Sequence, residues 1–197
     1  MSVLDTFPPP SLDVAKWTDY FAGSTASQVG FPEDGYFVHG VDDSGDHVYV
    51  ESKSKISLPA NKYFSVQIMY KDIYYDADQD IRYYFGYRSN QQDGGGNPLY
   101  GVDLMLLAEP GGVFFFQQRV IVGGVETISN LLADPTGGAD GGFKVIRNGT
   151  VYSLYRFDGR WTPVVDVGLG FSGPGYIRFG VMAENVGLAA FPWVAKI

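Results

Sequence analysis

FKVIRNGTVYSLYRF, residues 143–157, carries the clearest structural signal in this chain of 197 residues. Two short runs rich in aromatic and β-branched residues flank Asn148-Gly149, and an Asn-Gly pair between such runs favours a type I′ β-hairpin. The stretch therefore predicts two antiparallel strands joined by a tight turn.

Short apolar or alternating runs closed by turn signals continue on both sides of this hairpin. Residues 81–88, IRYYFGYR, alternate with period two, as a strand does when its two faces differ. Only residues 11–20 indicate a short helix. Further strands are expected over residues 36–40, 47–52, 63–71, 99–107, 113–122, 176–183 and 188–197.

Composition favours the same class of fold. Aromatic residues make up 16% of the chain, which also contains 26 Gly and 11 Pro. Aromatic side chains fill pleated surfaces, while Gly and Pro supply the backbone angles of tight turns. The chain is long enough to bury a core, and neither Gly-rich loop divides it into two halves that could each close one. We expect a single domain over residues 1–197.

Charge and cysteine content exclude several classes of function. The net charge of −8 repels phosphate backbones and anionic lipids, so neither nucleic acid nor a membrane is expected as a partner. The absence of Cys removes disulfides, thiolate catalysis and Cys-ligated zinc. Residues 1–7 do not form a secretion signal, and no apolar run approaches the roughly 20 residues of a membrane span. We expect a soluble protein of a virion or the cytoplasm.

Segments at both ends of the chain resemble the concanavalin A-like lectin/glucanase superfamily, especially its LamG-like and laminarinase-like modules. The matching stretches are LDTF (4–7), LDVAKW (12–17), DGYFV (34–38), FKVIRNG (143–149), DGRW (158–161), IRFGV (177–181) and FPWV (191–194). The resemblance implies an all-β fold, a two-sheet antiparallel jelly-roll sandwich of the concanavalin A-like kind. It also implies that Trp17, Trp161 and Trp193 are buried structural plugs.

A catalytic carboxylate pair is not evident. Glycoside hydrolysis needs two carboxylates, one acting as acid and the other as nucleophile or base. The glucanases of the superfamily share an E-x-D-x-x-E strand, and none of Glu33, Glu51, Glu109, Glu126 and Glu184 has that spacing. We therefore do not expect an enzyme, and a hydrolase or lyase with a non-standard carboxylate pair is the alternative.

Asp76, Asp78 and Asp80 form a candidate calcium site. Oxygen ligands at this spacing open a calcium-binding loop, and many members of the superfamily bind calcium through loop carboxylates. The stretch is not an EF-hand, because Ile81 stands where Gly is required and Tyr87 where the bidentate Glu belongs. The other interpretation is a solvated, Asp-rich turn between two strands. No other cofactor is expected.

A glycan-binding face is the remaining candidate site. Sugars stack on aromatic rings and form hydrogen bonds with neighbouring Asn, Gln, Asp and Arg side chains. The middle strands supply six such residues in alternation, namely Arg82, Tyr84, Arg88, Asp103, Gln117 and Arg119. The alternating partners Tyr83, Phe85, Phe114 and Phe116 are expected in the core.

These observations predict a non-catalytic binding or structural module with a capacity for glycan recognition. A phage surface, decoration or tail component is one setting for such a module. Its partners would be a glycan or other virion proteins, and assembly into a homo-oligomer would raise the avidity of a weak site. A third hypothesis is an intracellular scaffold that uses the sandwich for protein contacts.

Overall fold

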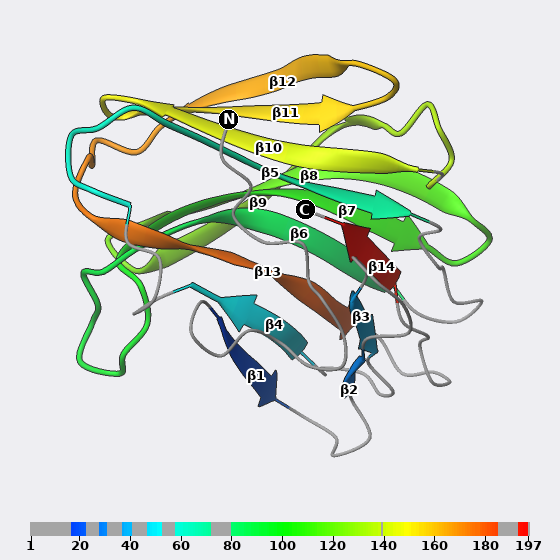
Figure 1. The fold of residues 1–197 in the computed structure, drawn as a ribbon, viewed down its shortest axis with the longest axis horizontal. Coiled ribbons are helices and arrows are strands. Elements are labelled where there is room, and N and C mark those ends of the chain that lie inside the picture. The colour runs from blue at the N-terminus through cyan, green and yellow to red at the C-terminus, as the bar shows by residue number, and fades with distance from the viewer. Residues whose placement is uncertain are drawn as a thin grey trace.

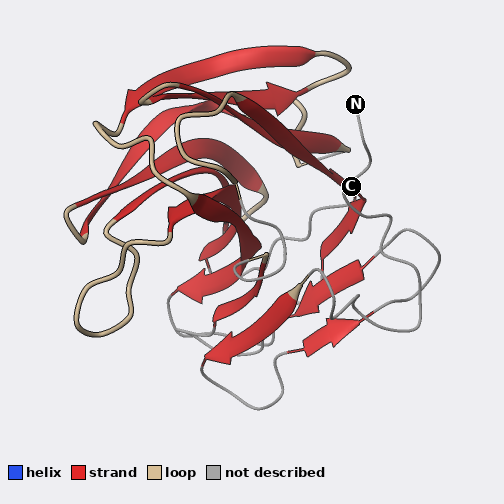
Figure 2. Cartoon of the chain, turned by 60° about the vertical axis from the view of Figure 1, so that its left-hand side comes forward, coloured by secondary structure: helices blue, strands red, loops and turns tan. Residues whose placement is uncertain are grey.

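The computed structural model of the chain consists of two antiparallel β-sheets (Figure 1). It describes residues 17–22, 28–30, 37–40, 47–52, 58–71, 80–138, 140–184 and 193–196. These ranges contain strands, turns and loops, as Figure 2 shows, and within them no helix is long and apolar enough to cross a membrane. Residues 18–20, which the sequence assigned to a short helix, lie in a strand.

Each sheet has seven strands. The first sheet has the order β1 (Thr18–Ala22), β4 (His47–Glu51), β13 (Gly175–Glu184), β6 (Asp80–Ser89), β7 (Tyr100–Glu109), β8 (Val113–Val122) and β9 (Val125–Ala133). The second has the order β12 (Trp161–Gly168), β11 (Val151–Phe157), β10 (Gly141–Asn148), β5 (Phe64–Lys71), β14 (Trp193–Lys196), β3 (Phe37–Gly40) and β2 (Gln28–Gly30). The predicted jelly-roll sandwich is confirmed.

The hairpin that anchored the fold assignment is β10 and β11. Asn148 pairs with Val151, so Gly149 and Thr150 form a two-residue loop. Gly149 has φ of 62°, whereas Thr150 does not take a positive φ. A positive φ at the first central residue alone is the type II′ pattern, so the hairpin was predicted correctly and its type I′ turn was not.

The core lies between the two sheets, where β10 contacts β6 and β7. Alternate residues of β6 enter it, and the four residues predicted there are buried, namely Tyr83, Phe85, Phe114 and Phe116. Trp17 is also buried, and its ring meets Phe179 edge-on with centroids 5.3 Å apart. These contacts confirm Trp17 as a core plug.

Trp161 does not belong to this core. Lys144 alternates with the core residues Phe143 and Val145, so it points to the outer face of the second sheet, and its Nζ lies 4.2 Å from the centre of the Trp161 ring. Trp161 is half-buried on that outer face, where the ammonium group of Lys144, and not the other sheet, lies against its ring. The side chain of Trp193 lies outside the described residues.

Candidate functional site

All six predicted glycan-binding residues lie on the outer face of the first sheet. Arg82, Tyr84 and Arg88 alternate along β6 with core residues, which places them on the face turned away from the second sheet. Strand register brings the other three alongside: Asp103 on β7 stands opposite Gly86 and Arg119, and Gln117 on β8 stands opposite Met105.

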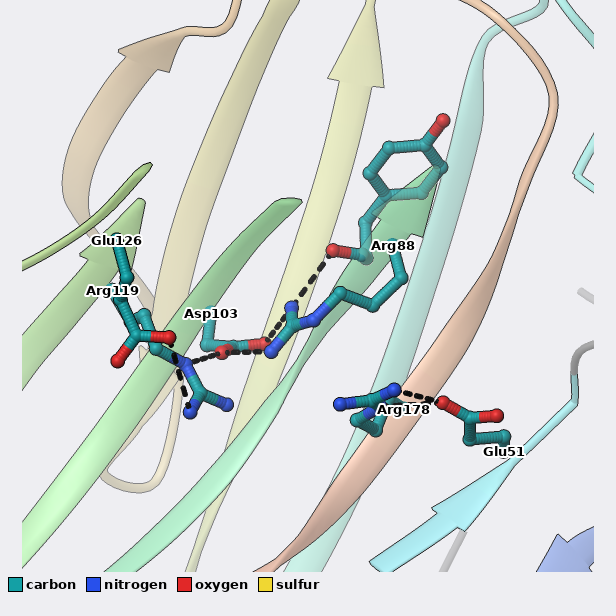
Figure 3. Close-up of polar contacts among 7 residues, drawn as sticks. Glu51, Arg88, Asp103, Arg119, Glu126 and Arg178 are labelled. Carbon is teal, nitrogen blue, oxygen red and sulfur yellow. Dashed lines mark hydrogen bonds and ion pairs between the residues drawn. The ribbon is translucent and has the colours of Figure 1, made fainter. Parts of the chain in front are cut away.

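Asp103 is the centre of a buried charged cluster, the Arg88–Asp103–Arg119 triad (Figure 3). Arg88 binds it in a bidentate manner, with Nη1 donating to Oδ1 and Nη2 to Oδ2, both at 2.6 Å. Arg119 Nε donates to Oδ2 at 2.5 Å. Asp103 is fully buried, and the two arginine side chains are only 1% and 6% exposed.

Gly86 makes room for this triad. A Cβ at Gly86 would lie 2.0 Å from both Asp103 Oδ1 and the carbonyl oxygen of Val102. Gly101 on the opposite strand also leaves space, since a Cβ at Gly101 would lie 3.0 Å from Arg88 Cδ. Two glycines therefore leave the space into which the carboxylate and the guanidinium fit.

The arginines keep Asp103 ionised. Burial alone would raise the pKa of Asp103, but the charges and hydrogen bonds of Arg119 and Arg88 outweigh it and lower that pKa. Burial likewise would lower the pKa of Arg119, and the charge of Asp103 raises it instead. The triad thus holds two positive charges and one negative charge, and Asp103 acts only as a hydrogen-bond acceptor.

A second ion pair joins β4 to β13 on the same face. Arg178 Nε donates to Glu51 Oε1 at 2.6 Å, and Arg178 Nη2 forms an ion pair with the same oxygen. The guanidinium also lies 4.3 Å from the centre of the Tyr49 ring. Sequence reasoning missed this pair. The alternation of Arg178 with the core residues Ile177 and Phe179 was the signal that could have revealed it.

Tyr84, Arg82 and Gln117 are engaged with neighbouring side chains. Arg119 lies over the Tyr84 ring at 4.6 Å from its centre, and burial raises the pKa of Tyr84. Arg82 Nε donates to Gln117 Oε1 at 2.9 Å, and Gln117 Nε2 donates to Asn130 Oδ1 at 2.6 Å. Tyr84 and Gln117 are also buried, so neither side chain presents a free surface to a ligand.

A hollow of about 320 Å³ opens beside the triad. Its lining includes three arginines carried by strands, Arg88, Arg119 and Arg178, which we call the floor of the hollow. The remaining described lining residues are Asp93, Asn97, Pro98, Ile121, Gly124, Glu126 and Met182. Arg88 and Arg119 are thus the two predicted residues that border the hollow.

The loop before β7 shapes one side of the hollow. Asp93 Oδ1 accepts hydrogen bonds from the backbone N–H groups of Gly95 and Asn97, at 2.9 and 2.8 Å, and its Oδ2 accepts from Asn97 Nδ2 at 3.1 Å. The bonds from Asn97 lower the pKa of Asp93. Asp93 therefore organises its own loop.

The calcium site stays a prediction. Asp76 and Asp78 lie outside the described residues, and Asp80 is the first residue of β6. Within the described ranges, no group of three or more His, Asp or Glu residues is arranged to hold a metal ion.

The described carboxylates in and around the hollow do not reproduce the E-x-D-x-x-E strand of the glucanases. The outward positions after Asp103 on β7 are Met105 and Leu107, both buried, and the strand's other carboxylate, Glu109, is six residues away at its end, so the E-x-D-x-x-E spacing is absent from β7. Asp103 and Glu51 are each bound by arginine, while Glu126 is half-exposed at the edge of the hollow. The arrangement offers fixed donors and acceptors, which suits binding.

The two sheets and their strand order define the concanavalin A-like, laminarinase-like jelly roll. Solved structures with this fold include the endo-β-1,3-glucanase of Pyrococcus furiosus, with 11% identity, TM-score 0.62, and coverage of 98% of this chain and 92% of that one. A glycoside hydrolase family 16 endo-glucanase of Bacteroides ovatus has 10% identity, TM-score 0.58, and coverage of 94% and 96%. The GlcNAcα1-4Gal-releasing endo-β-galactosidase of Clostridium perfringens has 14% identity, TM-score 0.66, and coverage of 98% and 60%.

At these identities the likeness establishes the fold. No family model matches the sequence, and no curated protein matches it.

Proposed function

We propose that this protein is a non-catalytic module that binds a glycan in the hollow on the outer face of its first sheet. The observation that carries the proposal is the state of Asp103, which is buried, ionised and bound by Arg88 and Arg119. A glycosidase needs a carboxyl that holds a proton for the leaving oxygen. A carboxyl with a lowered pKa and two guanidinium partners does not perform that step.

The lining of the hollow supports a sugar ligand. Sugar hydroxyls accept hydrogen bonds from guanidinium and amide N–H groups and donate to carboxylates, and the lining offers Arg119, Asn97 and Glu126 in these roles. Ile121 and Met182 add apolar surface against which a ring face can pack. The solved structures with the same fold include enzymes named for glucan and galactoside substrates, which agrees with a carbohydrate ligand.

The proposal includes action in several copies, as on a phage surface, where repetition of a weak site raises avidity by about 10²- to 10⁴-fold. The strand β9 supports association, because within the described part of the chain it is the last strand of its sheet, and an edge strand presents unpaired backbone groups. Val125 and Ile128 on this strand are exposed. A measurement of the mass of the full chain in solution tests this part, and a monomer at all concentrations would refute it.

A glycan array probed with the full-length chain tests binding, and a reducing-end assay on the array hits tests catalysis. We expect binding without release of reducing ends. The variant Arg119→Gln should weaken binding, whereas Arg160→Gln, at an exposed turn position, should not. Silence across the array would refute glycan binding, and release of reducing ends would show an enzyme.

A further inference from the structure

We infer that the ligand of this hollow carries an anionic group, a carboxylate or a sulfate, which sits on the floor formed by Arg88, Arg119 and Arg178. This inference rests on the proposed glycan-binding function and names the class of glycan. It follows from the balance of charges around the hollow, from unused guanidinium donors, and from the weak hold of Glu126.

The floor of the hollow presents positive charge. Three arginines, from β6, β8 and β13, line the hollow together with two carboxylates, Asp93 and Glu126, so the described lining has one positive charge in excess. The carboxylates that bind the arginines, Asp103 and Glu51, are as deeply buried as Arg88 and Arg119 and are not among the described lining residues. Arg88 and Arg119 share the single carboxylate of Asp103. The buried triad is therefore one negative charge short.

In the described part of the chain, two N–H groups of the positively charged floor lack hydrogen-bond acceptors. Among the residues that the structure describes, Arg88 Nε and Arg119 Nη2 are buried and have no hydrogen-bond acceptor. Figure 3 shows the terminal nitrogens of Arg119 directed away from Asp103. Buried N–H groups of a cation are costly when they lack an acceptor, and a carboxylate or sulfate offers several acceptor oxygens of opposite charge. An anionic ligand would supply the missing charge.

The two carboxylates of the described lining, Glu126 and Asp93, do not neutralise the charge of the floor. Glu126 Oε2 is 3.9 Å from Arg119 Nη1, and its side chain is 47% exposed, so this pair is loose and contributes little. Asp93 is occupied by its own loop. A ligand anion can therefore displace Glu126 from Arg119 at small cost. The hollow, about 320 Å³, falls at the lower end of the roughly 300–1,000 Å³ of small-ligand sites.

Titration calorimetry of the full-length chain tests the inference with pairs of acidic and neutral sugars of the same backbone. The probes are tetragalacturonate, its methyl ester, a sulfated galactose tetramer, the unsulfated tetramer and sodium sulfate at constant ionic strength. We expect at least one acidic sugar to bind about tenfold or more tightly than its neutral counterpart, as charge-assisted hydrogen bonds imply. The difference should shrink as salt is added.

Two variants locate the anion. Arg119→Gln should remove most of the preference for the acidic sugar, because it weakens binding of the acidic sugar far more than binding of the neutral one. Glu126→Gln, at an exposed position, should strengthen binding of the acidic sugar by about twofold to fivefold, because it removes a competing charge without disturbing the core. Arg160→Gln is the charge-matched control, and thermal unfolding verifies that each variant is folded.

The outcomes separate this inference from the proposed function. Equal affinity for acidic and neutral sugars would overturn the anionic group and leave glycan binding intact. Binding of sodium sulfate as tightly as of the acidic sugars would overturn it in favour of a free-anion site. Absence of binding to every sugar would overturn both. A preference for the uronate or for the sulfated tetramer supports the inference and identifies the group.

Discussion

The substitution Asp103→Asn should destabilise the fold strongly, although it changes the side-chain volume very little. Asparagine keeps one oxygen acceptor but removes the negative charge that Arg88 and Arg119 share. Three hydrogen bonds to charged groups, at 2.6, 2.6 and 2.5 Å, lose their ionic partner. At about 1.5 kcal/mol each they amount to about 4.5 kcal/mol, within the roughly 3–5 kcal/mol lost when a buried ion pair is broken.

Urea unfolding at pH 7, followed by tryptophan fluorescence, measures this loss. With a slope of about 2–3 kcal/mol per M, the midpoint should fall by about 1–2 M at an unchanged slope. Asp158→Asn is the matched control, because Asp158 also pairs with an arginine, Arg156, at 3.0 Å, but is 20% exposed. The control should lose less than about 1 kcal/mol. Equal, small losses in the two variants would refute the account of the triad.

The pH dependence gives a second reading of the same prediction. The folded pKa of Asp103 lies below its unfolded value of about 3.9. At a pH between these two pKa values, the folded state therefore binds fewer protons than the unfolded state. The stabilisation by Asp103 is therefore complete above about pH 4 and is lost as the pH falls through the lower, folded value. The difference in unfolding free energy between wild type and Asp103→Asn should be constant from pH 8 to 5 and shrink below pH 4. A difference that grows on acidification would contradict the argument.

Three further predictions concern stability and metal binding. Arg147→Met should lower the free energy of unfolding in urea by about 3–5 kcal/mol. Arg147 is buried and donates to the carbonyl oxygens of Pro59, Lys62 and Gly173, which would lose their donors. A loss below about 1 kcal/mol would show that these carbonyls find other partners. Gly86→Ala should lower the free energy of unfolding by at least about 2 kcal/mol, because its Cβ would meet the Val102 carbonyl oxygen at 2.0 Å. The control Gly94→Ala should be nearly neutral, because a Cβ there would have nothing within 4 Å. Equal effects of the two variants on the melting temperature would contradict the close packing of β6 on β7. Calcium binding by Asp76, Asp78 and Asp80 predicts that added Ca²⁺ raises the melting temperature and that Asp78→Asn abolishes the rise; an unchanged melting temperature in wild type would count against a site there.

Alternation along single strands is visible in the amino-acid sequence itself. The period of two in residues 81–88 separates Tyr83 and Phe85, which enter the core, from Arg82 and Arg88, which face outward. The direction of a side chain relative to its neighbours is a local property of an extended backbone. For the same reason the β10–β11 hairpin could be predicted from its Asn-Gly turn, although the type of that turn depended on which residue adopted a positive φ.

The sequence did not show which face of a strand meets the other sheet. Alternation shows that Trp161 and its neighbours point to opposite sides, but it does not say which side meets the other sheet. The resemblance placed Trp161 in the core, and the structure places it on the outer face beneath Lys144. That choice depends on which face of β12 is covered by a distant part of the chain.

Composition, turn residues and alternation were enough to establish an all-β sandwich and to mark Arg88, Asp103 and Arg119 as members of one polar face. Strand order and register, which the folded chain alone reveals, join these three into a triad and bring Arg178 and Glu51 beside them from segments 127 residues apart. The reason is physical. Extended backbone geometry is set residue by residue. Which strands become neighbours depends on the whole chain, because the free energy gained by burying the core must exceed the entropy lost in closing long loops.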